Sequence, residues 1–309
     1  MRLRILAGVL AGFVPALATA QLPEYGRLLA QARAIAATET SPPPLAPEKP
    51  DPTWRNVGLI GGFTAGVALY GSQKWWSDGL TSHFRSESEG WFGKDTPYGG
   101  VDKLGHLYTT YASARILTPV FEWMGNDAKA SRTLATWTAF GVMAGVEIVD
   151  GFSKQYKFSR EDFIANGVGA VFAYVMEAQP GFDKLVDFRI AYKQSTHSSD
   201  WDPFGDYSGQ RYLLVAKADA LPALRDNPLT RYLEVSVGYG TRGYDASQGV
   251  SATRSRDVYF GISLNLARVL ADGFYGGTMS TTRTQRNTER FLDLVQLPVA
   301  AYARKELDQ

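Results

Sequence analysis

The fold follows from residues 102–123, DKLGHLYTTYASARILTPVFEW, a largely apolar run that carries Asp102, Lys103 and His106 near its start. Two later apolar runs carry polar pairs of the same kind. The three pairs are Asp102 with His106, Glu147 with Asp150, and Asp162 with Asn166. Spacings of three or four residues put each pair on one face of a helix. Ionisable groups are costly to bury unless they are paired or liganded, so these pairs predict one shared polar cluster between packed helices.

Apolar periodicity in this stretch and on both sides of it predicts four helices. They are expected near residues 54–74, 102–123, 131–150 and 160–177. Glycines repeat every four residues in the first helix, and Trp54 and Trp75 bracket it, which favours a membrane-associated bundle. The fully apolar part of that helix spans only residues 57–70, which is more typical of a buried core helix. A compact bundle in water is therefore the alternative.

The hydrophobic pattern changes to a period of two after Pro180. The strand candidates are residues 187–192, 211–218, 233–240 and 258–266. Alternation of this kind predicts an antiparallel sheet with one apolar face. We favour packing of that face on the helices, and contact with lipid or another subunit is the alternative. Residues 271–286 are polar and predict a loop, and residues 291–305 predict a short helix.

The predicted fold class is α+β, a four-helix, membrane-associated bundle followed by a small antiparallel β region. The predicted segments are a signal peptide at 1–20, a short helix and proline-rich linker at 21–53, a helical domain at 54–180 and a strand-rich region at 181–309. The signal peptide is predicted from Arg2 and Arg4, the apolar run 5–17 and the small residues 18–20. A retained membrane anchor is the alternative for that segment.

The composition narrows the classes of function. The net charge is +1 and no long basic run is present, so nucleic acid is not an expected partner. The chain has no cysteine, which excludes disulfides, thiolate metal sites and a lipid-modified cysteine. We therefore expect an exported protein of the periplasm or a cell-envelope membrane, stabilised by packing or by the membrane. The choice between inner and outer membrane stays open.

Several motifs resemble those of known families in the same order. The matching residues are GGVDKLGH at 99–106 with Tyr111, EIVDGFS at 147–153, Phe158-Ser159, Asp162, and Asn166-Gly167 with Gly169. They resemble the signatures of the YfiM-like family of bacterial envelope proteins over roughly residues 54–180, and VanZ-like membrane proteins are more loosely similar. The resemblance implies a small, membrane-associated envelope bundle with no known reaction. Members are often described as periplasmic lipoproteins, whereas this chain lacks the cysteine.

Two of the paired carboxylates, those of Asp102 and Asp162, can also be explained as helix caps. Asp102 stands where the second helix is expected to begin, so its side chain is placed to cap that helix. Ser159 is a credible N-cap for the fourth helix, and Asp162 follows three residues later, which is close to a capping box. Capping therefore competes with a site role for both aspartates.

The other polar residues are harder to explain by local structure. Glu147 and Asp150 close a helix at its negative end, which is unfavourable unless a cation, a metal or an ion-pair partner compensates. His106 and Asn166 lie in apolar helices, where an imidazole is commonly a satisfied core residue and an amide commonly bonds to another helix. The prediction narrows to a cluster centred on His106 and Glu147.

Two functions remain open for this cluster. In the first, the protein is a membrane-associated binding or assembly component of the envelope, and the buried polar groups set the helix register. In the second, it is a hydrolase of lipid or cell-wall intermediates, with His106 as general base or metal ligand and Asp102, Glu147 and Asp162 as ligands or orienting groups. His106, Glu147 and Asp162 are the candidate ligands of a divalent metal. The expected partners are membrane lipid or envelope components, and a second copy of the chain.

No standard catalytic signature accompanies the cluster. The sequence contains no His-Glu-x-x-His, no Gly-x-Ser-x-Gly and no phosphate-binding loop motif. Whether the protein is an enzyme is therefore undecided from the sequence, and the binding or assembly role is favoured.

Overall fold

The computed structural model divides the chain into two compact units, Met1–Pro50 and Asp51–Gln309. The described residues are 27, 30–31, 51–195, 201–244 and 253–308. The predicted signal peptide lies outside them, and so does almost all of the predicted short helix and linker. Arg27, Ala30 and Gln31 are described, and all three are helical. The predicted helical and strand-rich regions lie in the second unit, and the predicted boundary between them stays a prediction.

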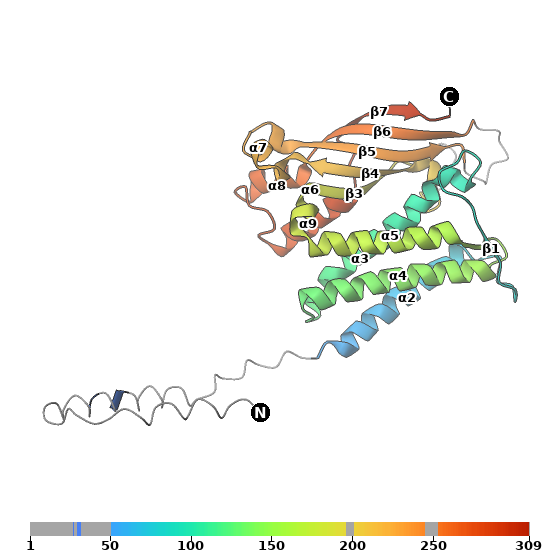
Figure 1. The fold of residues 1–309 in the computed structure, drawn as a ribbon, viewed down its shortest axis with the longest axis horizontal. Coiled ribbons are helices and arrows are strands. Elements are labelled where there is room, and N and C mark those ends of the chain that lie inside the picture. Colours follow the sequence, from blue (N-terminus) through green and yellow to red (C-terminus); the bar gives the residue numbers. More distant parts are fainter. Residues whose placement is uncertain (1–26, 28–29, 32–50, 196–200, 245–252, 309) are drawn as a thin grey trace, which may run out of the picture. The chain divides into compact units, whose positions relative to one another are not determined.

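Four long helices lie at the predicted places (Figure 1). They are α2 (Thr53–Lys74), α3 (Val101–Trp123), α4 (Ala128–Phe152) and α5 (Arg160–Ala178). The predicted count of four is wrong, because the described residues contain eight α-helices. The additional ones are α6 (Pro180–Leu185), α7 (Pro222–Arg225), α8 (Leu266–Phe274) and α9 (Arg283–Leu294). Side-chain caps start two of these short helices: the Asn265 side chain accepts from Arg268 N, and the Thr282 side chain accepts from Gln285 N.

Close packing of α3, α4 and α5 forms the centre of the helical layer. Tyr111 and Ala139 are fully buried, and Ala173 of α5 is nearly so. Gly169 lets α5 approach the backbone of α3, because a Cβ atom there would lie 2.2 Å from Leu107 O. This close approach fixes the relative position of the helices that carry the predicted polar pairs.

The expectation of helices that span a membrane is not met by the described part of the chain. None of its helices combines the length and the apolar character that crossing a bilayer requires. In α3 the reason is visible in the sequence, since Asp102, Lys103 and Arg115 interrupt its apolar run.

The predicted antiparallel sheet is present and has five strands in the order β3-β4-β5-β6-β7. They are β3 (Val186–Tyr192), β4 (Gln210–Lys217), β5 (Leu233–Arg242), β6 (Ser255–Leu264) and β7 (Ala300–Glu306). The fifth strand was not predicted, and the loop and helix expected near the C-terminal end are instead α8, α9 and β7. A separate parallel pair, β1 (Ser86–Glu87) with β2 (Phe158–Ser159), joins the loop after α2 to the start of α5.

The apolar face of the sheet is only partly covered by helices. Phe188 and Tyr212 pack against Tyr108 of α3, with ring centroids 5.7 and 5.6 Å from the Tyr108 ring. Much of the remaining face is exposed, including Leu214, Leu233, Val235, Val237, Phe260, Ile262 and Leu264. The strand register places Val235 opposite Ile262. The favoured packing of the sheet on the helices therefore holds at β3 and β4 and, through Tyr239, at one end of β5.

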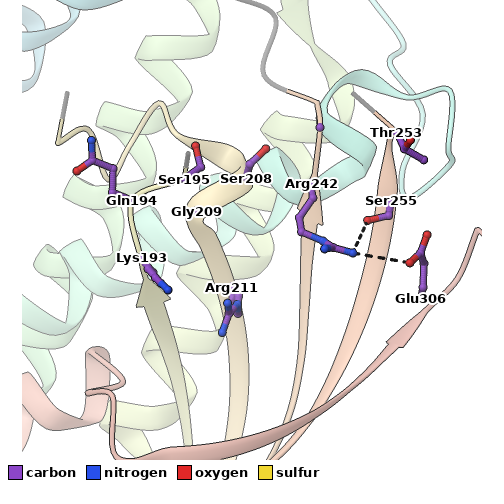
Figure 2. Close-up of a pocket in the computed structure, with 11 residues that line it drawn as sticks. Lys193, Gln194, Ser195, Ser208, Gly209, Arg211, Arg242, Thr253, Ser255 and Glu306 are labelled. Carbon is purple, nitrogen blue, oxygen red and sulfur yellow. Dashed lines mark hydrogen bonds and ion pairs between the residues drawn. The ribbon is translucent and has the colours of Figure 1, made fainter. Parts of the chain in front are cut away.

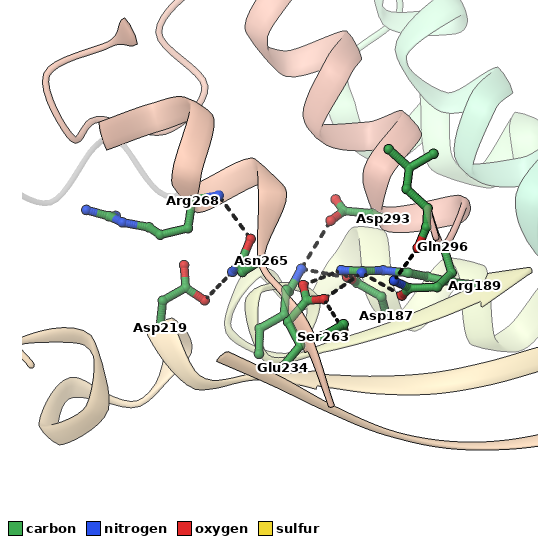
Figure 3. A network of polar contacts seen from close by, with 11 residues as sticks. Asp187, Arg189, Asp219, Glu234, Ser263, Asn265, Arg268, Asp293 and Gln296 are labelled. Carbon is green, nitrogen blue, oxygen red and sulfur yellow. Dashed lines mark hydrogen bonds and ion pairs between the residues drawn. The ribbon is translucent and has the colours of Figure 1, made fainter. Parts of the chain in front are cut away.

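The opposite face of the sheet buries charged side chains (Figure 3). Arg189 Nη1 and Nη2 lie 2.9 and 2.8 Å from the two carboxylate oxygens of Glu234, and Arg189 also pairs with Asp187. Lys217 Nζ lies 2.6 Å from Asp187 Oδ1 and 3.2 Å from Asp293 Oδ1. The period-two alternation predicted that the apolar face of the sheet would be buried. In the structure, the charged face is the better buried of the two.

Candidate functional site

Three helices bring together the side chains at the centre of the predicted cluster. His106 of α3 lies between two carboxylates: its Nδ1 is 3.2 Å from Glu147 Oε1 of α4, and its Nε2 is 3.9 Å from Asp162 Oδ2 of α5. One ligand atom from each of the three residues lies within 4.8 Å of the other two. Glu147 and Asp162 are buried, whereas 20% of the His106 side chain is exposed. The imidazole therefore joins a buried acidic centre to solvent.

Lys103 connects this centre to two further carboxylates. Its Nζ lies 2.7 Å from Asp102 Oδ2 and 3.3 Å from Asp162 Oδ1, and it also pairs with Glu89. The Lys103 side chain is only 1% exposed. Glu89, Asp102 and Asp162 form a second set of ligand-type atoms that lie within 4.8 Å of one another.

Glu89 is a member of the site that the sequence reasoning missed. It lies between α2 and α3 in a segment with many charged residues, where nothing distinguishes it from a solvated side chain. The available signal was Lys103, because a lysine beside an apolar helix face requires acidic partners if it is buried.

Asp150 and Asn166 lie beside the centre and bond to other groups. Asp150 Oδ1 accepts a hydrogen bond of 2.6 Å from the Trp76 indole Nε1. Asn166 is fully buried, and its Oδ1 accepts a hydrogen bond of 2.9 Å from Thr110 Oγ1. The amide therefore links α5 to α3, as an amide in an apolar helix commonly does.

The predicted cap is present at Ser159, but neither carboxylate caps a helix. Gly100 is the N-cap of α3 and no side chain caps it, while Asp102 lies in the first turn and is 3% exposed. Ser159 caps α5, because its Oγ accepts from Asp162 N at 3.3 Å. The reciprocal acceptor is Glu147, whose Oε2 accepts from Ser159 N at 3.3 Å. The Asp162 carboxylate is left to face His106 and Lys103.

Several buried polar atoms of the cluster have no hydrogen-bond partner among the described residues. They are Asp102 Oδ1, His106 Nδ1, Glu147 Oε1, Asp162 Oδ1 and Asn166 Nδ2. His106 Nδ1 and Glu147 Oε1 are near each other, at 3.2 Å, but the direction of the contact is not that of a hydrogen bond. A buried polar atom without a partner costs roughly 1–3 kcal/mol. The carboxylate oxygens and His106 Nδ1 can offer lone pairs to a bound cation, whereas Asn166 Nδ2 is a hydrogen-bond donor.

Burial opposes negative charge on Glu147, Asp102 and Asp150. It raises the pKa of Glu147 to about 9, and the neighbouring Asp162 and Asp150 carboxylates raise that pKa further toward this value. Burial also raises the pKa of Asp102 and of Asp150 to about 7. In contrast, the carboxylates around Lys103 raise its pKa above the ordinary value and overcome the opposing effect of its burial. The acidic groups therefore hold either protons or a cation.

The donor set suits a hard or borderline divalent ion. Two carboxylates and one imidazole offer oxygen and nitrogen ligands, which Mn²⁺, Fe²⁺ and Zn²⁺ accept. Three protein ligands would leave coordination positions for water or a substrate, as in catalytic metal sites. A general base is the other chemistry open to His106, because its imidazole reaches solvent and contacts a carboxylate on either side.

Comparison with known proteins bears on this part of the chain. A family model described as "Predicted periplasmic lipoprotein (DUF2279)" matches residues 88–178, which include every carboxylate of the cluster, Lys103 and His106. No curated protein and no solved structure matches the chain. The match does not carry the YfiM-like or VanZ-like names, and it does not distinguish the inner from the outer membrane. It supports an exported, periplasmic envelope protein of unknown activity.

Proposed function

We propose that this chain is a binding component of the bacterial cell envelope whose helical region holds a divalent metal ion. The proposed ligands are His106, Glu147 and Asp162. Asp102 and Glu89 lie in the adjoining group around Lys103, where they would adjust the charge of the site. The binding role was favoured from the sequence, and the metal was the alternative that the same residues allowed.

The observation that carries this proposal is the excess of buried negative charge. The acidic members of the cluster are Glu89, Asp102, Glu147, Asp150 and Asp162. Lys103 is a permanent cation, and it contacts three of them, Glu89, Asp102 and Asp162. One ammonium cannot neutralise all of these carboxylates, and uncompensated buried charge is strongly destabilising. A divalent ion among His106, Glu147 and Asp162 would supply the missing positive charge and engage the lone pairs of Glu147 Oε1 and His106 Nδ1.

Metal content and metal affinity test the proposal directly. The protein is purified without chelators or affinity metals, its metal is measured by mass spectrometry, and the stripped protein is titrated with Mn²⁺ and Zn²⁺. We expect close to one ion per chain. The His106→Gln variant removes one ligand but keeps a hydrogen-bonding side chain, and we expect it to weaken affinity by at least about tenfold.

His83→Gln is the matched control, because His83 is an exposed histidine outside the cluster and its ring contacts only the neighbouring Ser82 among the described residues. This variant should bind metal like the unmodified protein. Native protein that carries no metal and gains none on titration would overturn the proposal. Equal losses in the two histidine variants would place the metal elsewhere.

A metal-dependent hydrolase is the second candidate, and the exposure of His106 favours it. A purely structural ion is commonly closed off by four protein ligands, whereas this centre offers three ligands and a side chain that reaches solvent. Lipid or cell-wall intermediates are the proposed substrates. Release of inorganic phosphate from a lipid pyrophosphate by the metal-loaded protein, lost in His106→Gln and kept in His83→Gln, would favour this candidate. Metal binding without turnover would favour the binding role.

Membrane lipid and other envelope components are the partners that we propose for the protein, together with a second copy of the chain. The exposed apolar residues of β5 and β6 support a partner on that face of the sheet. Sedimentation with isolated envelope membranes, and the mass of the purified protein in solution, test the two kinds of partner separately.

A further inference from the structure

A cavity of about 520 Å³ lies at one end of the sheet. Figure 2 shows Lys193 and Arg211 on one side of it, and Arg242 with Glu306 on the other. None of the residues that line it belongs to the polar cluster of α3, α4 and α5. Its volume is within the range that small-molecule sites usually occupy.

The positive charge that lines the cavity is only partly neutralised. Arg242 is already paired, since its Nε lies 2.9 Å from Asp257 Oδ2 and its Nη2 lies 3.7 Å from Glu306 Oε2. Lys193 and Arg211 have no acidic partner within ion-pair distance among the described residues. Two cations at the same rim are therefore available to an anion.

Arg211 is held in place by aromatic rings instead of a carboxylate. Its guanidinium carbon lies 4.9 Å from the centroid of the Tyr259 ring and 6.0 Å from that of Tyr302. A guanidinium that stacks on rings keeps its N–H donors free to bond in its own plane. The two rings therefore orient the Arg211 guanidinium but leave its N–H donors free to bond a ligand.

Two glycines make room for this stack. A Cβ atom at Gly261 would lie 2.7 Å from the Tyr302 ring, and one at Gly240 would lie 3.3 Å from Arg211 Cγ. Both glycines lie within paired strands, where a residue without a side chain is unfavourable unless another group needs the space. Arg211 and its two tyrosines use part of this space, beside Ser236 Oγ at Gly261 and the Gln210 carbonyl oxygen at Gly240.

We propose that this cavity binds the phosphate group of an anionic ligand, through the guanidinium of Arg211 and the ammonium of Lys193. A guanidinium donates two parallel N–H bonds to phosphate, and a nearby ammonium adds a point charge. Ser255 also lines the cavity, and its hydroxyl accepts a bond of 3.1 Å from Arg242 Nη2, which leaves its own proton for donation. The cavity is large enough for a phosphorylated headgroup or a small phosphorylated metabolite.

The first experiment measures a soluble phosphate monoester and a lipid one. sn-Glycerol 3-phosphate is titrated calorimetrically, with glycerol as the uncharged counterpart, and flotation compares vesicles of phosphatidic acid with vesicles of phosphatidylcholine. EDTA is present throughout, so that a metal at the helical cluster cannot bind the phosphate. Binding of glycerol 3-phosphate indicates a soluble ligand, and binding of the phosphatidic acid vesicles alone indicates a lipid headgroup. Failure of both phosphate probes overturns the proposal.

Variants at Arg211 tie the binding to this cavity. Arg211→Gln should weaken binding of the phosphate probe that binds by at least tenfold. Arg211→Lys keeps the positive charge but loses the two parallel N–H donors of the guanidinium, and it should weaken binding less. Arg225→Gln is the control, because Arg225 is half-exposed in α7 and contacts only the adjacent Asp226 among the described residues. An equal loss in the control, or no loss in Arg211→Gln, would overturn the proposal. Thermal unfolding of each variant verifies that it is folded.

Discussion

Two buried networks of charged residues, one in the helices and one under the sheet, differ in how completely their charges are paired. Under the sheet, Arg189 bonds to Asp187 and Glu234, and Lys217 bonds to Asp187 and Asp293. The side-chain atoms of these residues all have hydrogen-bond partners where they are buried. In the helices, Lys103 meets several carboxylates and buried oxygens remain without partners.

In the sheet network the buried polar atoms are bonded to one another, whereas the helical cluster has buried polar atoms that need a further partner. A buried ion pair is tolerated when the geometry is good and every remaining polar atom is bonded, as under the sheet. Burial and neighbouring carboxylates raise the pKa of Glu147 and Asp102 in the helical cluster, as they raise that of Asp187 under the sheet. The helical cluster differs because some of its buried oxygens have no hydrogen-bond partner among the described residues. We infer that the sheet network contributes to structure and that the helical cluster is arranged for a ligand.

The largest effect is expected from breaking the sheet network. Arg189→Met keeps the volume of the side chain but leaves Asp187 and Glu234 without their main cation. We expect the free energy of unfolding to fall by about 3–5 kcal/mol. Denaturant unfolding measures it, and Lys305→Met on exposed β7 should change it by less than about 0.5 kcal/mol. An Arg189 variant as stable as the parent would show that the network is dispensable.

The next effect is the gain in stability when metal binds the helical cluster. A ligand that binds only the folded state stabilises it by about 2.7 kcal/mol at a free concentration 100 times its Kd. We expect Mn²⁺ or Zn²⁺ to raise the unfolding temperature of the stripped protein, and His106→Gln to reduce that rise. The Arg189→Met variant should keep the rise if it folds, because the sheet network takes no part in metal binding. An equal rise in the unfolding temperature of His106→Gln would contradict the idea that the helical cluster, unlike the sheet network, binds metal.

A smaller effect is expected from the hydrogen bond at the edge of the cluster. Thr110→Val is nearly isosteric and removes the donor to Asn166 Oδ1, which is fully buried. Because the Asn166 amide nitrogen already has no partner among the described residues, we expect a loss of about 1–2 kcal/mol. Thr133→Val is the matched control, since Thr133 donates to Lys129 O on the exposed side of α4. Equal losses of stability in the two variants would show that the bond to Asn166 contributes no more than an exposed hydrogen bond.

The pH dependence of the stripped protein sharpens the comparison further. The folded-state pKa of Glu147 is raised from 4.5 to about 9, so the folded chain holds a proton that the unfolded chain has released. The free energy of unfolding should therefore fall as the pH rises from about 4.5 to about 9, by at most ~1.4 kcal/mol per pH unit from this group. Glu147→Gln should flatten the slope in chelator. The same slope in both proteins would mean that Glu147 does not cause it.

The helical part of the fold and the members of its cluster could largely be predicted from local spacing. Apolar periodicity located α2, α3, α4 and α5, and spacings of three and four placed His106 and Glu147 on helix faces. Glu89 could not be predicted, because its partner Lys103 lies across a loop and distant pairing leaves no local pattern. Helix α8 was missed because it is brief, and α9 was missed because its sequence is largely polar.

The sheet shows the limit of the same reasoning. Period-two alternation identified β5 and β6 correctly, since successive side chains of a strand must point to opposite faces. It could not tell which face would be covered. Arg189 and Lys217 bury the charged face by pairing with carboxylates of other segments, while Val235 and Ile262 stay exposed.

The sequence by itself determined where helices and strands form and which polar residues share a helix face, because both depend on neighbours a few positions apart. Tertiary structure alone decided which of those polar residues meet. It paired Arg189 with Glu234 across the sheet, brought His106, Glu147 and Asp162 together, and left Glu147 Oε1 and His106 Nδ1 without a hydrogen bond among the described residues. Charge balance depends on contacts between distant segments, and it is this balance that separates the structural network from the candidate metal site.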